Sequence, residues 1–367
     1  MRRRLLIFIT IVATLLSYTA YKLHESLDIS FVTVLPFMLP LFFLMFGSMI
    51  FSRMHEPLND QRWFQLFSSF GTIFIGLWGS YVIFSLVTDF LKLVVSGINI
   101  DHYTLPLSFV IVIFGFFEVL RGPVVKSIQI LRKNISADLH QFKIVQISDL
   151  HIGASIRETY VDKVISKTNA LNADLVVITG DLIDGKPSSI QHVIDKLKEL
   201  KAKHGVYYVV GNHEYYWGIE SVLSSLSQTG MTILLNENKI IDIQGTKLLI
   251  SGITDPAAHS MQPSRPPDIV KASETTHAPD FKILLAHQPS IYPQAEKLNY
   301  DLQLSGHTHA GQFFPFSLFI GFFHKYSRGL YQHKEMHVYV NPGTGYWGPA
   351  NRFGIPAEIT LLTLTKN

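Results

Sequence analysis

The sequence predicts an α/β fold, in which sheets are covered by helices, preceded by about four membrane-spanning helices. Hydrophobic residues make up 47% of the 367-residue chain and charged residues only 16%, and most of this imbalance lies in residues 1–121. From residue 122 to residue 367, short apolar runs alternate with amphipathic helical patterns and then give way to a strand-rich half. We therefore expect a transmembrane helical region over residues 1–121 and a globular domain over residues 122–367.

Four apolar stretches fill the first third of the chain, at residues 5–21, 29–51, 66–95 and 104–120. Each is close to the roughly 20 residues that cross a hydrocarbon core. An arginine run at residues 2–4 precedes the first stretch, as in a signal peptide, but residues 17–20 (SYTA) form a poor cleavage site. We expect an uncleaved anchor and a multi-pass protein of the cell membrane. A buried helical core is the alternative, which the length of the stretches disfavours.

Basic residues near the ends of these stretches predict their orientation. Nine fall on one side of the expected membrane: Arg2, Arg3, Arg4, Arg53, Arg62, Arg121, Lys126, Arg132 and Lys133. Only Lys22 and Lys92 fall on the other side. This bias favours both termini, and hence the globular domain, on the cytoplasmic side.

The globular domain is expected to contain many short strands and fewer helices. Strands are expected at residues 124–131, 143–148, 175–179, 206–210, 232–235, 239–243, 247–251, 281–286, 301–305, 336–340 and 358–364. Helices are expected at residues 156–171, 190–200, 219–226 and 290–298. Residues 255–280 are rich in Pro, Ser and Thr, which indicates a surface loop.

Polar side chains with metal-binding chemistry follow five of these strands. They are, in chain order, Asp149 with His151, Asp181, Asn212 with His213, His287, and His307 with His309. In open α/β sheets, ligands bind beyond the carboxyl ends of the strands. Because five successive strand ends deliver Asp, Asn or His, we interpret them as one site.

The residue types indicate a pair of divalent metal ions. The chain has no cysteine, so any metal must be held by nitrogen and oxygen. Imidazole, carboxylate and amide oxygen suit Mn, Fe or Zn, and a carboxylate can bridge two ions. Two such ions can clamp the attacking and leaving oxygens of a phosphoryl transfer. In D-x-H and H-x-H, an extended backbone would point alternate side chains the same way.

The motifs resemble those of the calcineurin-like metallophosphoesterase family. The match consists of D-x-H (Asp149, His151), G-D-x-x-D (Asp181, Asp184), G-N-H-E (Asn212, His213), a lone His287 and G-H-x-H (His307, His309), all in family order. The resemblance implies an αββα sandwich and a metal-dependent hydrolase of phosphoric esters.

The resemblance also implies a role for each residue. Asp149, His151 and His309 would hold one metal ion, and Asn212, His287 and His307 the other. Asp181 would bridge both ions, and His213 would protonate the leaving group. Asp184 and Glu214 are expected to support the site without binding metal.

A narrower resemblance is to transmembrane proteins with a metallophosphoesterase domain. It rests on GHTHAGQ at residues 306–312, on the tail at residues 341–364 and on the leading apolar stretches. Some relatives cleave lipid-linked pyrophosphates such as UDP-2,3-diacylglucosamine, and others cleave simple phosphodiesters. We expect a phosphodiesterase or pyrophosphatase with a lipid-linked substrate. The alternatives are a tethered phosphatase of soluble nucleotides or phosphoproteins, and a non-catalytic membrane scaffold or sensor.

Contacts to the substrate are a separate question. The planar guanidinium of Arg352 could bind a phosphate, or could form an ordinary salt bridge. Residues 313–323 (FFPFSLFIGFF) follow the last histidines directly. They predict either a buried strand and turn or an apolar lip, including Phe316 and Phe319, that meets lipid. The expected partners are the bilayer and a phosphate ester. Nucleic acid is not expected, because the net charge is only +3 and no long basic run exists.

Overall fold

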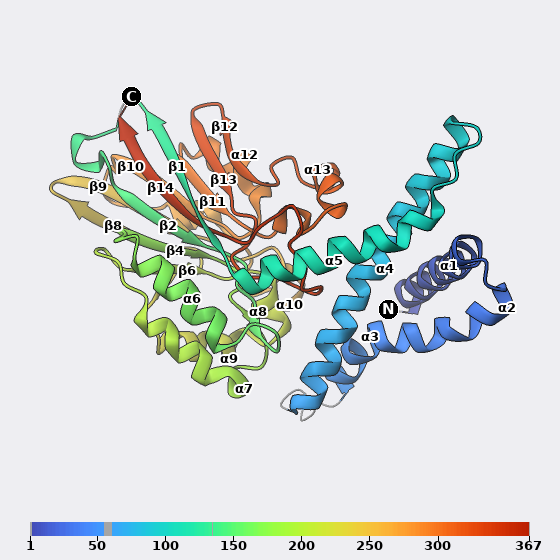
Figure 1. The fold of residues 1–367 in the computed structure, drawn as a ribbon. Coiled ribbons are helices and arrows are strands. Elements are labelled where there is room, and N and C mark those ends of the chain that lie inside the picture. The colour runs from blue at the N-terminus through green and yellow to red at the C-terminus, as the bar shows by residue number, and fades with distance from the viewer. Residues whose placement is uncertain (1, 55–60, 134, 367) are drawn as a thin grey trace. The chain divides into compact units, whose positions relative to one another are not determined.

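The computed structural model describes residues 2–54, 61–133 and 135–366, and it divides into two compact units (Figure 1). One unit, which we call the helical unit, comprises Met1–Phe117 together with Gly348–Phe353. The other, which we call the sandwich unit, comprises Glu118–Trp347 and Gly354–Asn367. The segment Gly348–Phe353, expected within the globular domain, therefore groups with the helices.

The helical unit contains long apolar helices. Its elements are α1 (Arg2–Leu27), α2 (Phe31–Val34), the 3₁₀ turn η1 (Leu35–Phe37), α3 (Met38–Met54), α4 (Arg62–Val94), η3 (Asp101–Tyr103) and α5 (Thr104–Arg121). Among the described residues, three segments are long and apolar enough to cross a membrane: Leu6–Leu27, Leu66–Val94 and Asp101–Arg121. The expected span at residues 29–51 contains the 3₁₀ turn η1, and its apolar helical part, Phe31–Gly47, is shorter than these three. Pro36 lies in η1, and it lacks the N–H that would continue the helical hydrogen bonds.

A buried lysine joins three helices of this unit. Lys22, near the end of α1, donates from Nζ to Glu25, to Asp89 of α4 and to Asp101 of η3, each at 2.7 Å. Its side chain is fully buried, and Lys92 of α4 also pairs with Asp101. The charges therefore lie at one common end of the bundle.

The sandwich unit is built on two six-stranded sheets. The first has the order β1 (Val124–Arg132), β14 (Glu358–Lys366), β2 (Lys143–Ile147), β4 (Leu175–Thr179), β6 (Val206–Val209) and β7 (Thr232–Ile233). The second has the order β12 (Gly329–His333), β13 (Met336–Val340), β11 (Leu302–Ser305), β10 (Phe281–Leu285), β9 (Thr246–Gly252) and β8 (Glu237–Ile243). The central strands β2, β4 and β6 are mutually parallel, as are β9, β10, β11 and β13.

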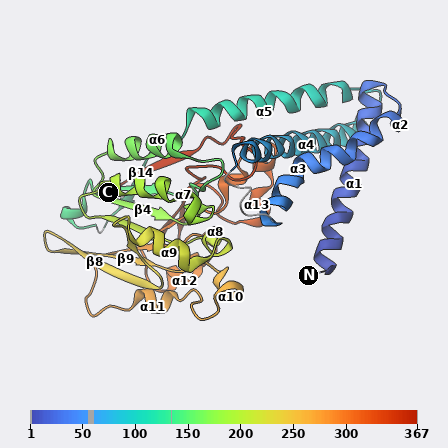
Figure 2. The same cartoon turned by 90° about the horizontal axis from the view of Figure 1, so that it is seen from below.

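Helices cover the outer face of each sheet. The first is covered by α6 (Glu158–Asn169), α7 (Pro187–Ile194) and α9 (Ile219–Ser227), and the second by α11 (Ile269–Ser273) and α12 (Tyr292–Lys297). Figure 2 shows α6 and α11 on opposite sides of the strands. Between the sheets, apolar residues such as Ile144, Val177, Ile283 and Leu304 form a fully buried core. The expected αββα sandwich is confirmed.

Several elements differ from the sequence-based expectation. Residues 255–280 are not a continuous loop, because they contain α10 (Ala258–Met261) and α11. Residues 313–323 contain η8 (Phe316–Leu318) and α13 (Ile320–Phe323) and no strand, so the buried-strand interpretation was wrong. The sequence also did not indicate β12, α8 (Asn212–Tyr216) or the two-stranded sheet of β3 (Ile152–Gly153) and β5 (Ile183–Asp184). The remaining 3₁₀ turns are η4 (Ala137–Leu139), η5 (Asp195–Glu199), η6 (Pro289–Ile291) and η7 (His309–Gly311).

Candidate metal centre

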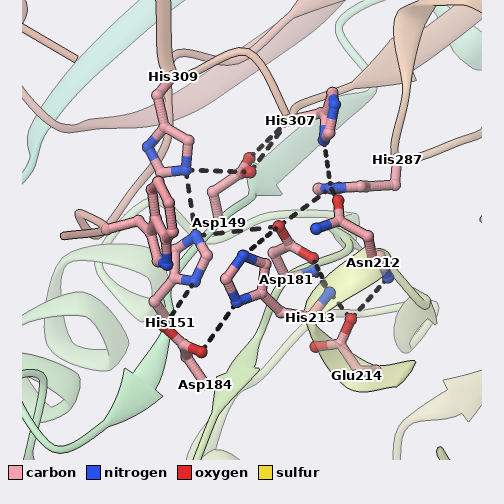
Figure 3. A network of polar contacts seen from close by, with 12 residues as sticks. Asp149, His151, Asp181, Asp184, Asn212, His213, Glu214, His287, His307 and His309 are labelled. Carbon is pink, nitrogen blue, oxygen red and sulfur yellow. Dashed lines mark hydrogen bonds and ion pairs between the residues drawn. The ribbon is translucent and has the colours of Figure 1, made fainter. Parts of the chain in front are cut away.

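The seven expected ligands come together where strands of both sheets end (Figure 3). Asp149 with His151, Asp181 and Asn212 follow β2, β4 and β6 of the first sheet. His287, and His307 with His309, follow β10 and β11 of the second sheet. The carboxyl ends of these strands therefore lie at the same end of the two sheets.

One group at this end consists of Asp149, His151 and His309. The Nε2 atoms of the two histidines lie 3.1 Å apart, and His309 Nε2 lies 3.5 Å from Asp149 Oδ1. One ligand atom from each residue lies within 4.8 Å of the others. This is the first of the two ligand sets expected from the sequence.

A second group consists of Asp181, His287 and His307, with Asn212 beside it. His287 Nε2 lies 3.2 Å from Asp181 Oδ2, 3.2 Å from Asn212 Oδ1 and 3.2 Å from His307 Nδ1. Asp181 Oδ2 is also 3.9 Å from His151 Nε2 in the first group. Asp181 thus lies between the two groups, as a bridging ligand must.

These residues fit a pair of cations chemically. Within the described part of the chain, the ion-pair partners of Asp149 and Asp181 are histidines. Both carboxylates are buried, and burial raises the pKa of Asp149, with the neighbouring Asp181 charge adding to the effect. Ring nitrogens and carboxylate oxygens converging at such distances form the nitrogen–oxygen donor set that borderline divalent metals prefer.

The backbone is left-handed, and not extended, at five of the seven expected ligands. The φ angles are 51° at Asp149, 54° at His151, 48° at Asp181, 70° at His307 and 47° at His309. The expectation of an extended D-x-H segment was therefore wrong. This conformation costs on the order of 1 kcal/mol or more per non-glycine residue, so the surrounding contacts must impose it.

Two motif glycines allow the ligands to approach the backbone. A Cβ at Gly180, where φ is +86°, would lie 2.4 Å from His287 Nδ1. A Cβ at Gly306 would lie 2.2 Å from Asp149 Oδ2. The same close packing lets His287 Nδ1 hydrogen-bond the Thr179 carbonyl at 2.8 Å, which orients Nε2 toward the site.

Glu214 holds two of the ligand-bearing turns together. Its buried carboxylate accepts backbone N–H groups from Gly211 at 2.6 Å, Asp181 at 3.1 Å, Leu182 at 2.8 Å and Ile183 at 2.9 Å. The sequence suggested a structural role for Glu214 but did not reveal which groups it binds.

His213 lies beside the two groups and is paired with Asp184. Its Nδ1 is 2.8 Å from Asp184 Oδ1, and Trp217 Nε1 donates to the same oxygen at 2.8 Å. Burial opposes protonation of His213, but the Asp184 hydrogen bond and the charges of Asp181 and Asp184 raise its pKa to about 9. His213 Nε2 lies 4.0 Å from Asp181 Oδ2, so the ring faces the site.

Comparisons with known proteins agree with this geometry. A sequence model described as calcineurin-like phosphoesterase matches residues 142–311. A Campylobacter jejuni protein named as a metallophosphoesterase is 34% identical over 355 residues, covering 91% of this chain and 88% of that protein. The chain belongs to the calcineurin-like metallophosphoesterase family.

Other relatives of this metallophosphoesterase match over a smaller share of their length. A Helicobacter pylori protein named as a metallophosphoesterase is 40% identical over 252 residues, which are 68% of this chain and 66% of that protein. A Danio rerio protein named "Transmembrane protein with metallophosphoesterase domain" is 34% identical over 267 residues, which are 70% of this chain and 61% of that protein.

Membership of the family makes this metallophosphoesterase a hydrolase that depends on two metal ions. The transmembrane relative and the three apolar helices indicate that it is associated with a membrane. Both statements agree with the sequence-based expectation.

The three residues expected to contact the substrate, Arg352, Phe316 and Phe319, differ in burial and do not all belong to the same unit. Arg352 belongs to the helical unit, where its side chain is fully buried. Its backbone N–H donates to the Gly115 carbonyl at 3.1 Å. Its binding to phosphate stays a prediction. Phe316 is half-buried against Phe313, with ring centroids 4.9 Å apart, whereas Phe319 is exposed.

Proposed function

We propose that this metallophosphoesterase hydrolyses phosphodiester or pyrophosphate bonds at a centre of two divalent ions, Mn, Fe or Zn. Asp149, His151 and His309 would hold one ion, Asn212, His287 and His307 the other, and Asp181 both. The observation that carries this proposal is the position of Asp181 Oδ2 between two groups of convergent ring nitrogens. When bound, two such ions stabilise charge on the phosphoryl oxygens.

The side chains around the ligands suit direct hydrolysis. Asp184 hydrogen-bonds His213 Nδ1 and favours the protonated ring, from which His213 can donate a proton to the departing oxygen. The same hydrogen bond fixes the ring orientation. The chain contains neither a cysteine nor a G-x-S-x-G sequence, so a cysteine or a serine of that motif cannot be the nucleophile. Direct hydrolysis requires neither.

The membrane arrangement that we propose is multi-pass, with residues 122–367 on the cytoplasmic side. It is supported by the excess of Lys and Arg at that side of the apolar stretches and by the long apolar helices. A location at the membrane gives the site access to lipid-linked phosphates.

A lipid-linked substrate, of the kind represented by UDP-2,3-diacylglucosamine, is the more specific part of the proposal. The segment after the His307–His309 ligands exposes Leu318, Phe319, Phe322 and Phe323, with Phe322 84% accessible. Exposed apolar groups of this size are costly in water and gain free energy against acyl chains. Soluble nucleotides or phosphoproteins are the alternative substrates. A non-catalytic scaffold is disfavoured because every expected ligand is present.

The test of the activity uses the full chain in detergent with Mn²⁺ and bis-p-nitrophenyl phosphate. Hydrolysis that is lost on chelation and restored by Mn²⁺ supports the proposal. A purified, folded chain that cleaves neither this diester, nor nucleotides, nor lipid pyrophosphates in the presence of Mn²⁺, Fe²⁺ or Zn²⁺ contradicts it.

The test of the lipid substrate replaces exposed side chains of the 313–323 segment. Phe319→Ser with Phe322→Ser should lower kcat/KM for a lipid-linked pyrophosphate by roughly tenfold or more, since burying each phenyl ring is worth about 1.5–3 kcal/mol. Hydrolysis of the small diester should change much less. Val270→Ser removes an exposed apolar side chain of α11 and serves as control. Equal losses on both substrates would rule out a lipid-binding role.

A further inference from the structure

Two exposed aromatic rings flank His213. The ring centroid of Tyr216 lies 5.1 Å from that of His213, and the centroid of Trp347 lies 5.6 Å from it. The interplanar angles are 61° and 76°, so each ring meets the imidazole edge to face. Tyr216 is nevertheless 56% exposed and Trp347 49% exposed. Each therefore keeps much of its aromatic surface open beside the proposed proton donor.

Trp347 is held firmly despite its exposure. The buried side chain of Gln312 donates from Nε2 to the Trp347 carbonyl at 2.9 Å and accepts the Trp347 N–H through Oε1 at 2.8 Å. Gln312 follows closely on His307 and His309 in the same loop. The indole is thus attached by its backbone to the segment that carries two metal ligands.

Tyr216 is also connected to a segment that carries an expected metal ligand, in this case the one that follows β6 of the first sheet. It belongs to α8, the short helix that begins with Asn212 and His213 and that Glu214 ties to the Asp181 turn. Both rings are therefore connected to ligand-bearing segments, and their exposure is a property of the site and not of a loose surface loop. An aromatic side chain on a fixed backbone loses less conformational entropy on binding than one on a mobile loop.

We propose that Trp347 and Tyr216 form a stacking subsite for a planar nucleobase on the leaving group of the substrate. This inference rests on the proposed function, because it places the leaving group at His213. Aromatic side chains bind bases through their π faces, without requiring a particular base. An acyl chain has an exposed apolar surface elsewhere, at Phe319 and Phe322. The substrate class is therefore a nucleotide-containing phosphodiester or pyrophosphate.

The experiment compares two ligands that differ only in the base. The full chain, in detergent with Mn²⁺, hydrolyses bis-p-nitrophenyl phosphate while AMP or ribose 5-phosphate is titrated as inhibitor. We expect the wild type to bind AMP more tightly than ribose 5-phosphate by roughly 5- to 150-fold, the range given by alanine substitution at base-stacking residues. Trp347→Leu, which keeps an apolar side chain without the ring system, should remove most of this ratio.

Matched variants separate stacking from a general effect on the loop. Trp347→Phe should retain much of the preference for AMP, and Tyr216→Leu should lower it. Val270→Leu alters an exposed apolar side chain of α11 and should leave the ratio at its wild-type value. If Trp347→Leu weakens AMP and ribose 5-phosphate equally, or if the wild type binds both alike, the subsite is refuted.

The two possible failures can be told apart. Hydrolysis of the diester without a preference for AMP refutes the stacking subsite and leaves the proposed function intact. If the wild type hydrolyses nothing, the proposed function fails, and calorimetric titration of the Mn²⁺-loaded protein with the same two ligands still measures the ratio. A preference for AMP that Trp347→Leu removes in that titration supports the subsite, and its absence refutes it.

Discussion

Glu214 is fully buried next to the candidate metal centre, and its carboxylate accepts hydrogen bonds from four backbone N–H groups. Oε1 accepts from Leu182 and Ile183, and Oε2 accepts from Asp181 and Gly211. The carboxylate therefore satisfies four donors in two separate turns, including the one in which Asp181 is left-handed. It explains how part of the strained backbone at the ligands is maintained.

Replacing Glu214 with Gln should destabilise the protein and weaken metal binding. An amide has one acceptor oxygen, so two buried N–H groups would lose their acceptor, at about 1–3 kcal/mol each. The midpoint of thermal unfolding in detergent should fall, and the Mn²⁺ concentration needed for half-maximal activity should rise. Glu237→Gln, at an exposed carboxylate of β8, is the control. An unchanged midpoint in Glu214→Gln would show that the four hydrogen bonds matter little.

At the scale of single residues, the sequence predicts chemistry better than conformation. The residues that converge at the candidate metal centre could be predicted because Asp, Asn and His recur at strand ends in a family order. The left-handed backbone of Asp149 and His151 could not, since non-glycine residues adopt it only under tertiary constraint. Likewise, Gln312 and Trp347 meet through a contact between distant segments, which no local pattern indicates.

At the scale of elements, long apolar runs were predictable and short or mixed ones were not. The central strands β2, β4 and β10 are short, mostly apolar runs with mostly buried side chains, and they were expected. β3 and β5 have two residues each and depend on their pairing with one another. Residues 313–323 are apolar but form η8 and α13, with about half of the side chains exposed. A short apolar run cannot be assigned to a strand or to a helix by periodicity alone.

Lys22 gives an element-scale prediction about the helical unit. Lys22→Met keeps the volume but leaves Glu25, Asp89 and Asp101 together without their shared cation. Removing one partner of a buried ion pair costs about 3–5 kcal/mol, and the partial exposure of Glu25 and Asp89 places the expected loss at the lower end. The midpoint of thermal unfolding in detergent should fall clearly.

Lys92→Met is the matched comparison for that variant. Lys92 pairs with Asp101, and its side chain is 31% accessible, compared with 1% for Lys22. Its replacement should therefore lower the unfolding midpoint by much less. Equal effects of the two substitutions would contradict the role of Lys22 as the link between α1, α4 and η3.

At the scale of the whole molecule, the natural absence of cysteine allows a direct test of orientation. Val270→Cys places a single thiol on an exposed position of α11 in the sandwich unit. If this unit is cytoplasmic, a membrane-impermeant maleimide should label the thiol only after the cells are broken. Labelling in intact cells would place the unit on the outer side and overturn the orientation inferred from Lys and Arg.

The central claim of the account is that Asp181 bridges two metal ions. The most direct measurement is the metal content of the purified full chain, determined by mass spectrometry alongside Mn²⁺-dependent diester hydrolysis, for the wild type and Asp181→Asn. We predict two metal equivalents and activity in the wild type, and a reduced content with activity lowered at least a thousandfold in the folded variant. A wild type that binds a single equivalent at saturation, or an Asp181→Asn variant with wild-type activity, would contradict the account.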